Sequence, residues 1–169
     1  MEQWKQDLIK QTKTNPVEKS FRVVCQYCGK NANLVGGDYI YPHRKDLFNK
    51  NFWQCANGHE ESFVGCHPNS STPLGCLANA ELRRAKKETH AVFDFIWREK
   101  YSSRGAAYRW LAGALNIPVK DCHMGMFSVE QCKQAQLVAL HELAYLRNAR
   151  ATGYTAELRK QTTEGDRNG

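Results

Sequence analysis

Two short stretches decide the fold of the first half of this chain: Cys25-Gln-Tyr-Cys28-Gly29 and Cys55-Ala-Asn-Gly-His59. Each places two metal-type ligands on a tight turn that contains a glycine. Glycine suits such a turn because it has no Cβ and bends at little steric cost. Zinc takes four Cys or His ligands in a tetrahedron, and two separated pairs of this kind supply them. We therefore predict a zinc site formed by Cys25, Cys28, Cys55 and His59.

Such a site is structural, because four protein ligands leave no open position for a substrate. The alternatives are buried thiols, a disulfide, or a fourth ligand drawn from Cys66 and His67. We prefer His59 because it shares one short turn with Cys55, whereas Cys66 and His67 follow the strand expected over residues 61–64. Structural Zn²⁺ is accordingly the cofactor that the sequence predicts.

The composition of the chain indicates its cellular compartment and the redox state of its cysteines. Its 169 residues include seven cysteines, an odd number that cannot be fully paired within one chain. The start, Met1-Glu-Gln-Trp, begins a polar stretch unlike a signal peptide, and no stretch approaches the length of a membrane span. We expect a cytoplasmic protein with reduced thiols, in which metal binding is favoured over disulfides, and no membrane partner.

The polar and apolar pattern divides the chain into four segments. We expect an N-terminal arm over residues 1–20, with Trp4 and Leu8 on one helical face, a zinc-ribbon module over 21–67, a helical region over 68–150 and a flexible tail over 151–169. Strands are expected at residues 21–24, 32–35, 39–41, 51–54 and 61–64. A strand, a turn that carries two metal ligands (a knuckle) and a second strand, repeated after an intervening segment, form the layout of a zinc ribbon. In such a module the ion supplies the stability that a larger hydrophobic core would otherwise provide.

Capping residues mark the helices that follow. Asn79 is expected to cap a helix over about residues 80–100, and Ser103 a second over about 104–116. Ser128-Val-Glu-Gln131 has the pattern of a capping box and opens a third helix, to about residue 150. Residues 122–127 form a short apolar segment, interpreted as a possible strand. The predicted fold is α+β, an N-terminal zinc-ribbon-like β module packed on a small bundle of about three helices.

Six segments of the chain together resemble a known family. They are Cys25-Gln-Tyr-Cys28-Gly29, Val64-Gly-Cys-His-Pro68, Pro73-Leu-Gly-x-Leu-Ala-Asn-x-Glu-Leu-Arg83, His90-x-x-Phe-Asp94-x-x-Trp97, Ser103-Arg104-x-x-Ala-Tyr108-x-Trp-Leu-Ala112 and Cys122-His-Met-Gly-Met-Phe127. The string resembles the zinc-finger-containing domain family of small proteins common in tailed phages and prophages, over roughly residues 23–132. The resemblance implies a bound zinc, a phage or prophage origin and a bacterial host cell, with no settled activity. The family's second knuckle is usually a cysteine pair, whereas here His59 replaces a thiolate.

Positive charge indicates an acidic partner. The formal net charge is +7, which draws a protein to nucleic acid, anionic membranes or acidic protein surfaces; a basic solvated surface without a partner is the alternative. Basic side chains cluster on the first predicted helix, where arginine offers phosphate a planar fork and lysine a point charge. The predicted contacts to DNA or RNA are Arg83, Arg84, Lys86, Lys87, Arg104 and Arg109. The alternative is a protein-interaction module that binds and inhibits or redirects a host polymerase, nuclease or defence complex.

Evidence for catalysis in the sequence is weak, and no catalytic residue is predicted. His90 and Asp94 share a helical face, so a nuclease-like general base is one interpretation. A structural hydrogen-bonded pair is the preferred one, because no acidic cluster for a catalytic metal stands out. A second metal site is likewise less favoured than burial in the core. The residues concerned are Cys122, His123, Cys132 and His141.

Overall fold

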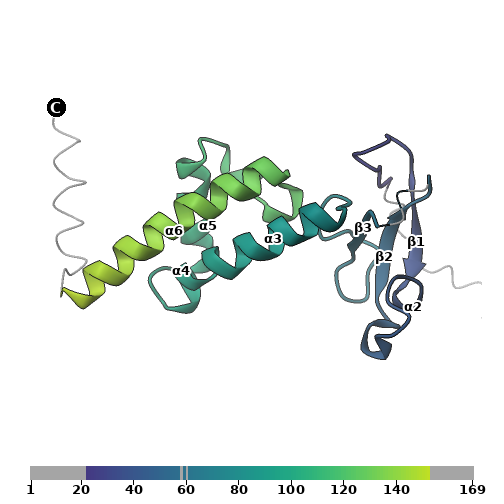
Figure 1. Ribbon diagram of the computed structural model, residues 1–169, viewed down its shortest axis with the longest axis horizontal. Coiled ribbons are helices and arrows are strands. Elements are labelled where there is room, and N and C mark those ends of the chain that lie inside the picture. The colour runs from purple at the N-terminus through teal and green to yellow at the C-terminus, as the bar shows by residue number, and fades with distance from the viewer. Residues whose placement is uncertain (1–21, 58, 60, 153–169) are drawn as a thin grey trace, which may run out of the picture.

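The computed structural model describes residues 22–57, 59 and 61–152. The expected arm over residues 1–20 and the tail from residue 153 onward lie outside these residues. In the described part of the chain, a three-stranded antiparallel sheet lies at one end and the long helices at the other (Figure 1). The predicted α+β fold class, a small N-terminal β module followed by helices, is confirmed.

The sheet has the strand order β1-β2-β3, with bounds Ala32–Gly36, Asn51–Cys55 and Phe63–Gly65. β1 pairs with β2 so that Ala32 lies opposite Cys55, and β2 pairs with β3 so that Gln54 lies opposite Phe63. This register brings the end of β2 beside the start of β1, which directly follows the first knuckle. Of the strand expected over residues 21–24, the described part contains only an isolated bridge between Val24 and Asn31.

The strand expected over residues 39–41 is absent, and this prediction was wrong. The chain instead forms a short helix, α2 (Gly37–Ile40), followed by the 3-10 helix η1 (Lys45–Leu47). Gly37 lies so close to the Leu47 carbonyl that no side chain fits there, and the segment folds back on itself instead of extending. Tyr41 then packs edge-on against the rings of Phe52 and Phe63, with ring centroids 5.7 Å away in each case.

Four further α-helices follow the sheet within residues 61–152, and three of them begin at the predicted caps. They are α3 (Ala80–Phe93), α4 (Phe95–Arg98), α5 (Arg104–Ala114) and α6 (Val129–Ala151). The side chains of Asn79 and Ser103 each accept a hydrogen bond from a first-turn amide, and Ser128 forms the full capping box with Gln131. The helix expected over residues 80–100 is interrupted at Asp94 and ends at Arg98.

The apolar segment at residues 122–127 is not a strand. It follows the short 3-10 helix η2 (Val119–Asp121) and contains a second one, η3 (Met124–Met126). Gly125 passes so close to Leu74 and Gly75 that neither glycine has room for a side chain. The Gly125 carbonyl accepts hydrogen bonds from the Cys76 amide at 3.0 Å and from Lys86 Nζ at 2.6 Å. These contacts join the connector after β3 to the segment before α6.

The main core lies among the helices. α3 runs along α6, and Phe93, Leu111 and Phe127 are fully buried around that contact (Figure 1). A second, much smaller cluster in the β module consists of Cys25, Ala32, Cys55 and Leu77. All seven cysteines lie in the described residues, and none forms a disulfide. None of the described helices is long and apolar enough to cross a membrane.

Candidate metal centre and adjoining cavity

Four metal-type ligands meet at the top of the β module. The ligand atoms of Cys25, Cys28, Cys55 and His59 all lie within 4.8 Å of one another. Cys55 Sγ is 3.6 Å from Cys28 Sγ and 3.6 Å from His59 Nδ1. A zinc tetrahedron with Zn–S of about 2.3 Å and Zn–N of about 2.0 Å separates its ligand atoms by roughly 3.5–3.8 Å. The donor set and its spacing therefore fit a structural zinc ion.

Backbone hydrogen bonds shape both knuckles around the site. Gly29 has a φ of +69°, a left-handed conformation that favours glycine, and its amide donates to the Cys25 carbonyl at 2.8 Å. In the second knuckle the Ser62 amide donates to the His59 carbonyl at 2.8 Å, and the Cys55 amide to the Ser62 carbonyl at 3.0 Å. These two hydrogen bonds close the turn between β2 and β3 that carries the second pair of ligands.

The two buried thiols differ in acidity. Burial raises the pKa of Cys25. Burial also acts to raise the pKa of Cys55, but hydrogen bonds with the Asn57 amide, with His59 and with the two neighbouring thiols outweigh this and lower its pKa to about 6. Thiolates are the form in which cysteine ligates metal. Cys55 is therefore available as a ligand at neutral pH.

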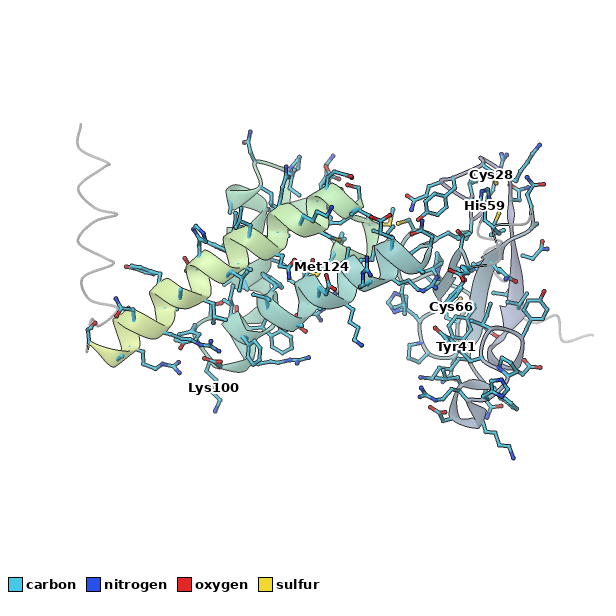
Figure 2. The ribbon with its side chains drawn as sticks, viewed as in Figure 1. Cys28, Tyr41, His59, Cys66, Lys100 and Met124 are labelled. Carbon is cyan, nitrogen blue, oxygen red and sulfur yellow. The ribbon has the colours of Figure 1, made fainter. Side chains whose placement is uncertain are left out.

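Cys66 and His67, the alternative ligands, lie away from this group. Cys66 is beyond the end of β3, its Sγ is 3.5 Å from the Ser71 carbonyl oxygen, and burial raises its pKa. Figure 2 shows Cys66 in a different part of the module from Cys28 and His59. Neither Cys66 nor His67 belongs to the one ligand group found among the described residues.

The sequence matches the model of one protein family, described as a zinc-finger-containing domain, over residues 21–142. The chain belongs to this family. It has no significant match among curated proteins or among solved structures. Membership in the family and the Cys3His cluster together assign zinc as the structural cofactor of this zinc-finger-containing protein.

The metal centre is tied to the start of α3. Leu77, fully buried, packs against Cys25 and Cys55. From the first knuckle, Gln26 Nε2 donates to the Leu77 carbonyl at 2.7 Å, and the hydroxyl of Tyr27 accepts a hydrogen bond from the Asn79 amide at 3.0 Å. The knuckle therefore positions the residue that caps α3.

A cavity of about 840 Å³ lies between the β module and the helices. Three of the predicted nucleic-acid contacts line it, Arg83 and Lys86 from α3 and Arg104 from α5. Its lining also includes His67, His90 and His123 but no Asp or Glu. Figure 2 shows its two sides through Tyr41, which lies in the β module, and Met124, which lies among the helices.

The three basic residues in the cavity are held in place by specific contacts. The Arg83 guanidinium lies 4.0 Å from the centre of the Phe63 ring and donates to the carbonyls of Glu61 and Ala78. Lys86 donates to the Gly125 carbonyl, and the Arg104 guanidinium lies 5.6 Å from the centre of the Tyr108 ring. These contacts orient the side chains without neutralising their charge.

The other three predicted contacts lie outside the cavity and are exposed. They are Arg84, Lys87 and Arg109. Arg84 pairs loosely with Glu88 at 4.0 Å, an exposed contact of little energetic consequence. The predicted cluster is therefore divided by the fold. Sequence reasoning missed the aromatic residues Tyr41 and Phe63 as its neighbours, because they belong to the β module and nothing local in the sequence indicates the contact.

His90 and Asp94 form the expected pair, with His90 Nδ1 3.1 Å from Asp94 Oδ1. Arg98 also reaches Asp94, at 3.1 Å, so the carboxylate contacts two basic side chains at the break between α3 and α4. Cys122 and Cys132 are buried in the helical core, and burial raises the pKa of both thiols. Among the described residues they join no second group of metal-type ligands.

Proposed function

We propose that this zinc-binding protein binds nucleic acid through the basic surface formed by α3 and α5. The observation that carries the proposal is the convergence of Arg83, Lys86 and Arg104 on one cavity whose lining contains no carboxylate. Arg84 and Lys87 extend the positive charge along α3, and Arg109 extends it along α5. The zinc acts as a scaffold that fixes the start of α3. A role in transcription or DNA regulation in a phage or prophage belongs to the same proposal.

Electrostatics supports a phosphate-rich partner. Within the described part of the chain, none of Arg83, Lys86, Lys87, Arg104 and Arg109 forms an ion pair with a carboxylate. Unpaired arginine and lysine side chains release counterions from nucleic acid when they bind phosphates, so affinity falls steeply as salt rises. The net charge of +7 also attracts nucleic acid, and it acts over a longer range than the individual side-chain contacts.

The test is a salt titration of the zinc-loaded protein against labelled single- and double-stranded DNA and RNA. A variant with Arg84→Gln and Lys87→Gln removes two exposed charges from α3. It should flatten the slope of log affinity against log salt by roughly 1.4–1.8. The control carries Lys50→Gln and Lys100→Gln, which remove the same charge from exposed positions before β2 and after α4. Equal effects of the two variants, or no binding at low salt, would refute the proposal.

A host protein is the second candidate partner. It is favoured by α6, where Leu137 and Leu140 lie one turn apart and are 59% and 47% exposed. A partner protein that covers them would gain apolar contact area that nucleic acid does not use. Binding to purified host RNA polymerase should then depend on these leucines. A variant with Leu137→Ser and Leu140→Ser that binds the polymerase as well as the unmodified chain would remove this candidate.

A further inference from the structure

The cavity between the β module and the helices combines positive charge with aromatic rings. We infer that it receives one unpaired nucleotide of a single strand, with the phosphate at the basic side chains and the base against the aromatic wall. The inference rests on the proposed function and deepens it, because it names single-stranded nucleic acid as the ligand and this cavity as the place where an unpaired base is held.

The charge of the cavity matches a phosphate. Arg83, Lys86 and Arg104 bring three positive side chains to one space, and the carbonyl groups that orient two of them carry no formal charge. The Asp94 carboxylate, which pairs with His90 and Arg98, is not part of the lining. An anion that enters therefore meets fixed donors and no opposing carboxylate. Arginine at such a site can grip a phosphate with two parallel hydrogen bonds.

The aromatic wall matches a base. Tyr41, Phe52 and Phe63 pack edge to face around one another, with centroid distances of 5.7–6.0 Å. All three line the cavity, and so does Tyr108 from α5. Phe52 is buried and the Arg83 guanidinium covers one face of Phe63, so the partly exposed rings of Tyr41 and Tyr108 are the ones that a base can reach. Burial raises the pKa of Tyr108, so its ring stays neutral and does not repel an anion. Bases of every sequence stack on such rings, which gives affinity without sequence preference.

The size of the cavity selects an unpaired nucleotide. Its volume of about 840 Å³ is typical of a small-molecule site, where pockets measure about 300–1,000 Å³. A base with its sugar and phosphate fits this space. A base inside a duplex is held between its neighbours and its partner, and reaches such a cavity only after it leaves the stack.

The walls are already built in the free protein. Gly75 and Gly125 allow two backbone segments to cross in close contact, and Lys86 Nζ fastens that crossing from α3. Exposed Leu74 and Met126, also in the lining, leave apolar surface beside the basic groups. A preformed site spends little free energy on ordering when its ligand binds.

The experiment measures binding of the zinc-loaded full chain to three probes. They are a fluorescent oligo-dT 12-mer, a duplex of the same length, and a mixture of the four nucleoside 5′-monophosphates as competitors of the 12-mer. We expect the single strand to bind roughly ten-fold more tightly than the duplex, a difference that one base–aromatic contact supplies. The monophosphates should compete with the single strand at high concentration.

Two matched pairs of variants locate the site. Arg104→Gln and Arg109→Gln each remove one exposed charge from α5, but only Arg104 lines the cavity. Tyr41→Leu removes a ring from the wall, whereas Tyr39→Leu removes an exposed ring that does not line it. Arg104→Gln and Tyr41→Leu should each weaken single-strand binding several-fold more than their controls and abolish competition by monophosphates. Circular dichroism and zinc content verify that each variant is folded.

The outcomes separate the inference from the proposed function. Equal affinity for duplex and single strand, with equal losses in Arg104→Gln and Arg109→Gln, would overturn the inference and leave nucleic-acid binding intact. Tight binding of a monophosphate without binding of the 12-mer would overturn it in favour of a free nucleotide. An absence of binding to every nucleic acid at low salt would overturn both.

Discussion

The two ends of this molecule are stabilised in different ways. The helical end buries a continuous core that includes Phe93, Leu111 and Phe127, whereas the β module buries only a small cluster around its own metal ligands. A core that small does not offset the entropy of ordering the chain, and the zinc ion supplies the missing free energy. The comparison shows how a single chain can place a metal-dependent fold beside one that depends on packing.

Removal of zinc gives the largest expected effect and is confined to one end. Chelation at neutral pH, or the variant Cys55→Ser, should unfold the β module, because structural zinc contributes about 10–16 kcal/mol to folding in small zinc-finger peptides. The helices should keep their circular dichroism at 222 nm, while amide hydrogen exchange becomes fast in β1, β2, β3 and the first turn of α3 and stays slow in α6. Cooperative loss of the helices together with the sheet would show that the two ends are a single unit.

The converse prediction concerns the helical core. Leu111→Ala removes a fully buried side chain and should destabilise the helical region by about 2–5 kcal/mol in urea unfolding. Zinc affinity, measured by competition with a chromophoric chelator, should remain unchanged, because Leu111 belongs to the helical cluster. Leu137→Ala, an exposed leucine on α6, is the control and should change stability by less than about 0.5 kcal/mol. A parallel loss of zinc affinity in Leu111→Ala would contradict the separation.

Sequence patterns predicted the parts of this fold that depend on local chemistry. The knuckles, the caps Asn79 and Ser103 and the capping box at Ser128 follow from residue type and spacing within a few positions. The segments at residues 39–41 and 122–127 were read wrongly as strands. Their conformations depend on close approaches of Gly37 to Leu47 and of Gly125 to Gly75, which join parts of the chain that local periodicity does not relate.

Local sequence patterns were equally unable to predict which residues meet in the cavity. Arg83, Lys86 and Arg104 were identified from the sequence as phosphate contacts on open helix faces. Their meeting with Tyr41 and Phe63 depends on how the β module packs against α3, and no local pattern encodes it. The sequence therefore singled out three basic residues that the fold brings to one cavity, and the tertiary structure added the shape of that cavity. Their contact with phosphate stays a prediction.

A smaller effect is expected at the contact between α3 and α6. The buried hydroxyl of Thr89 lies 2.8 Å from the Ala85 carbonyl and 3.0 Å from the Cys132 carbonyl, so it can donate across to α6. Thr89→Val keeps the shape and removes this donor, which should cost about 1 kcal/mol. Urea unfolding checks the value, with Thr89→Ser as a control that keeps the hydroxyl. A Thr89→Val variant as stable as the unmodified chain would show that packing alone holds the two helices.

The smallest expected effect tests how tightly the two ends are coupled. Tyr27→Phe removes the hydroxyl that accepts the Asn79 amide, a partly exposed hydrogen bond that joins the first knuckle to the cap of α3. Its loss should cost about 0.5 kcal/mol, because water can replace the acceptor. The informative readout is hydrogen exchange in the first turn of α3, which should become faster while exchange in α6 stays the same. Unchanged exchange in that turn would show that the contacts at Leu77 carry the coupling instead. The Leu77 side chain packs against the metal ligands, and its carbonyl accepts a hydrogen bond from Gln26 in the first knuckle.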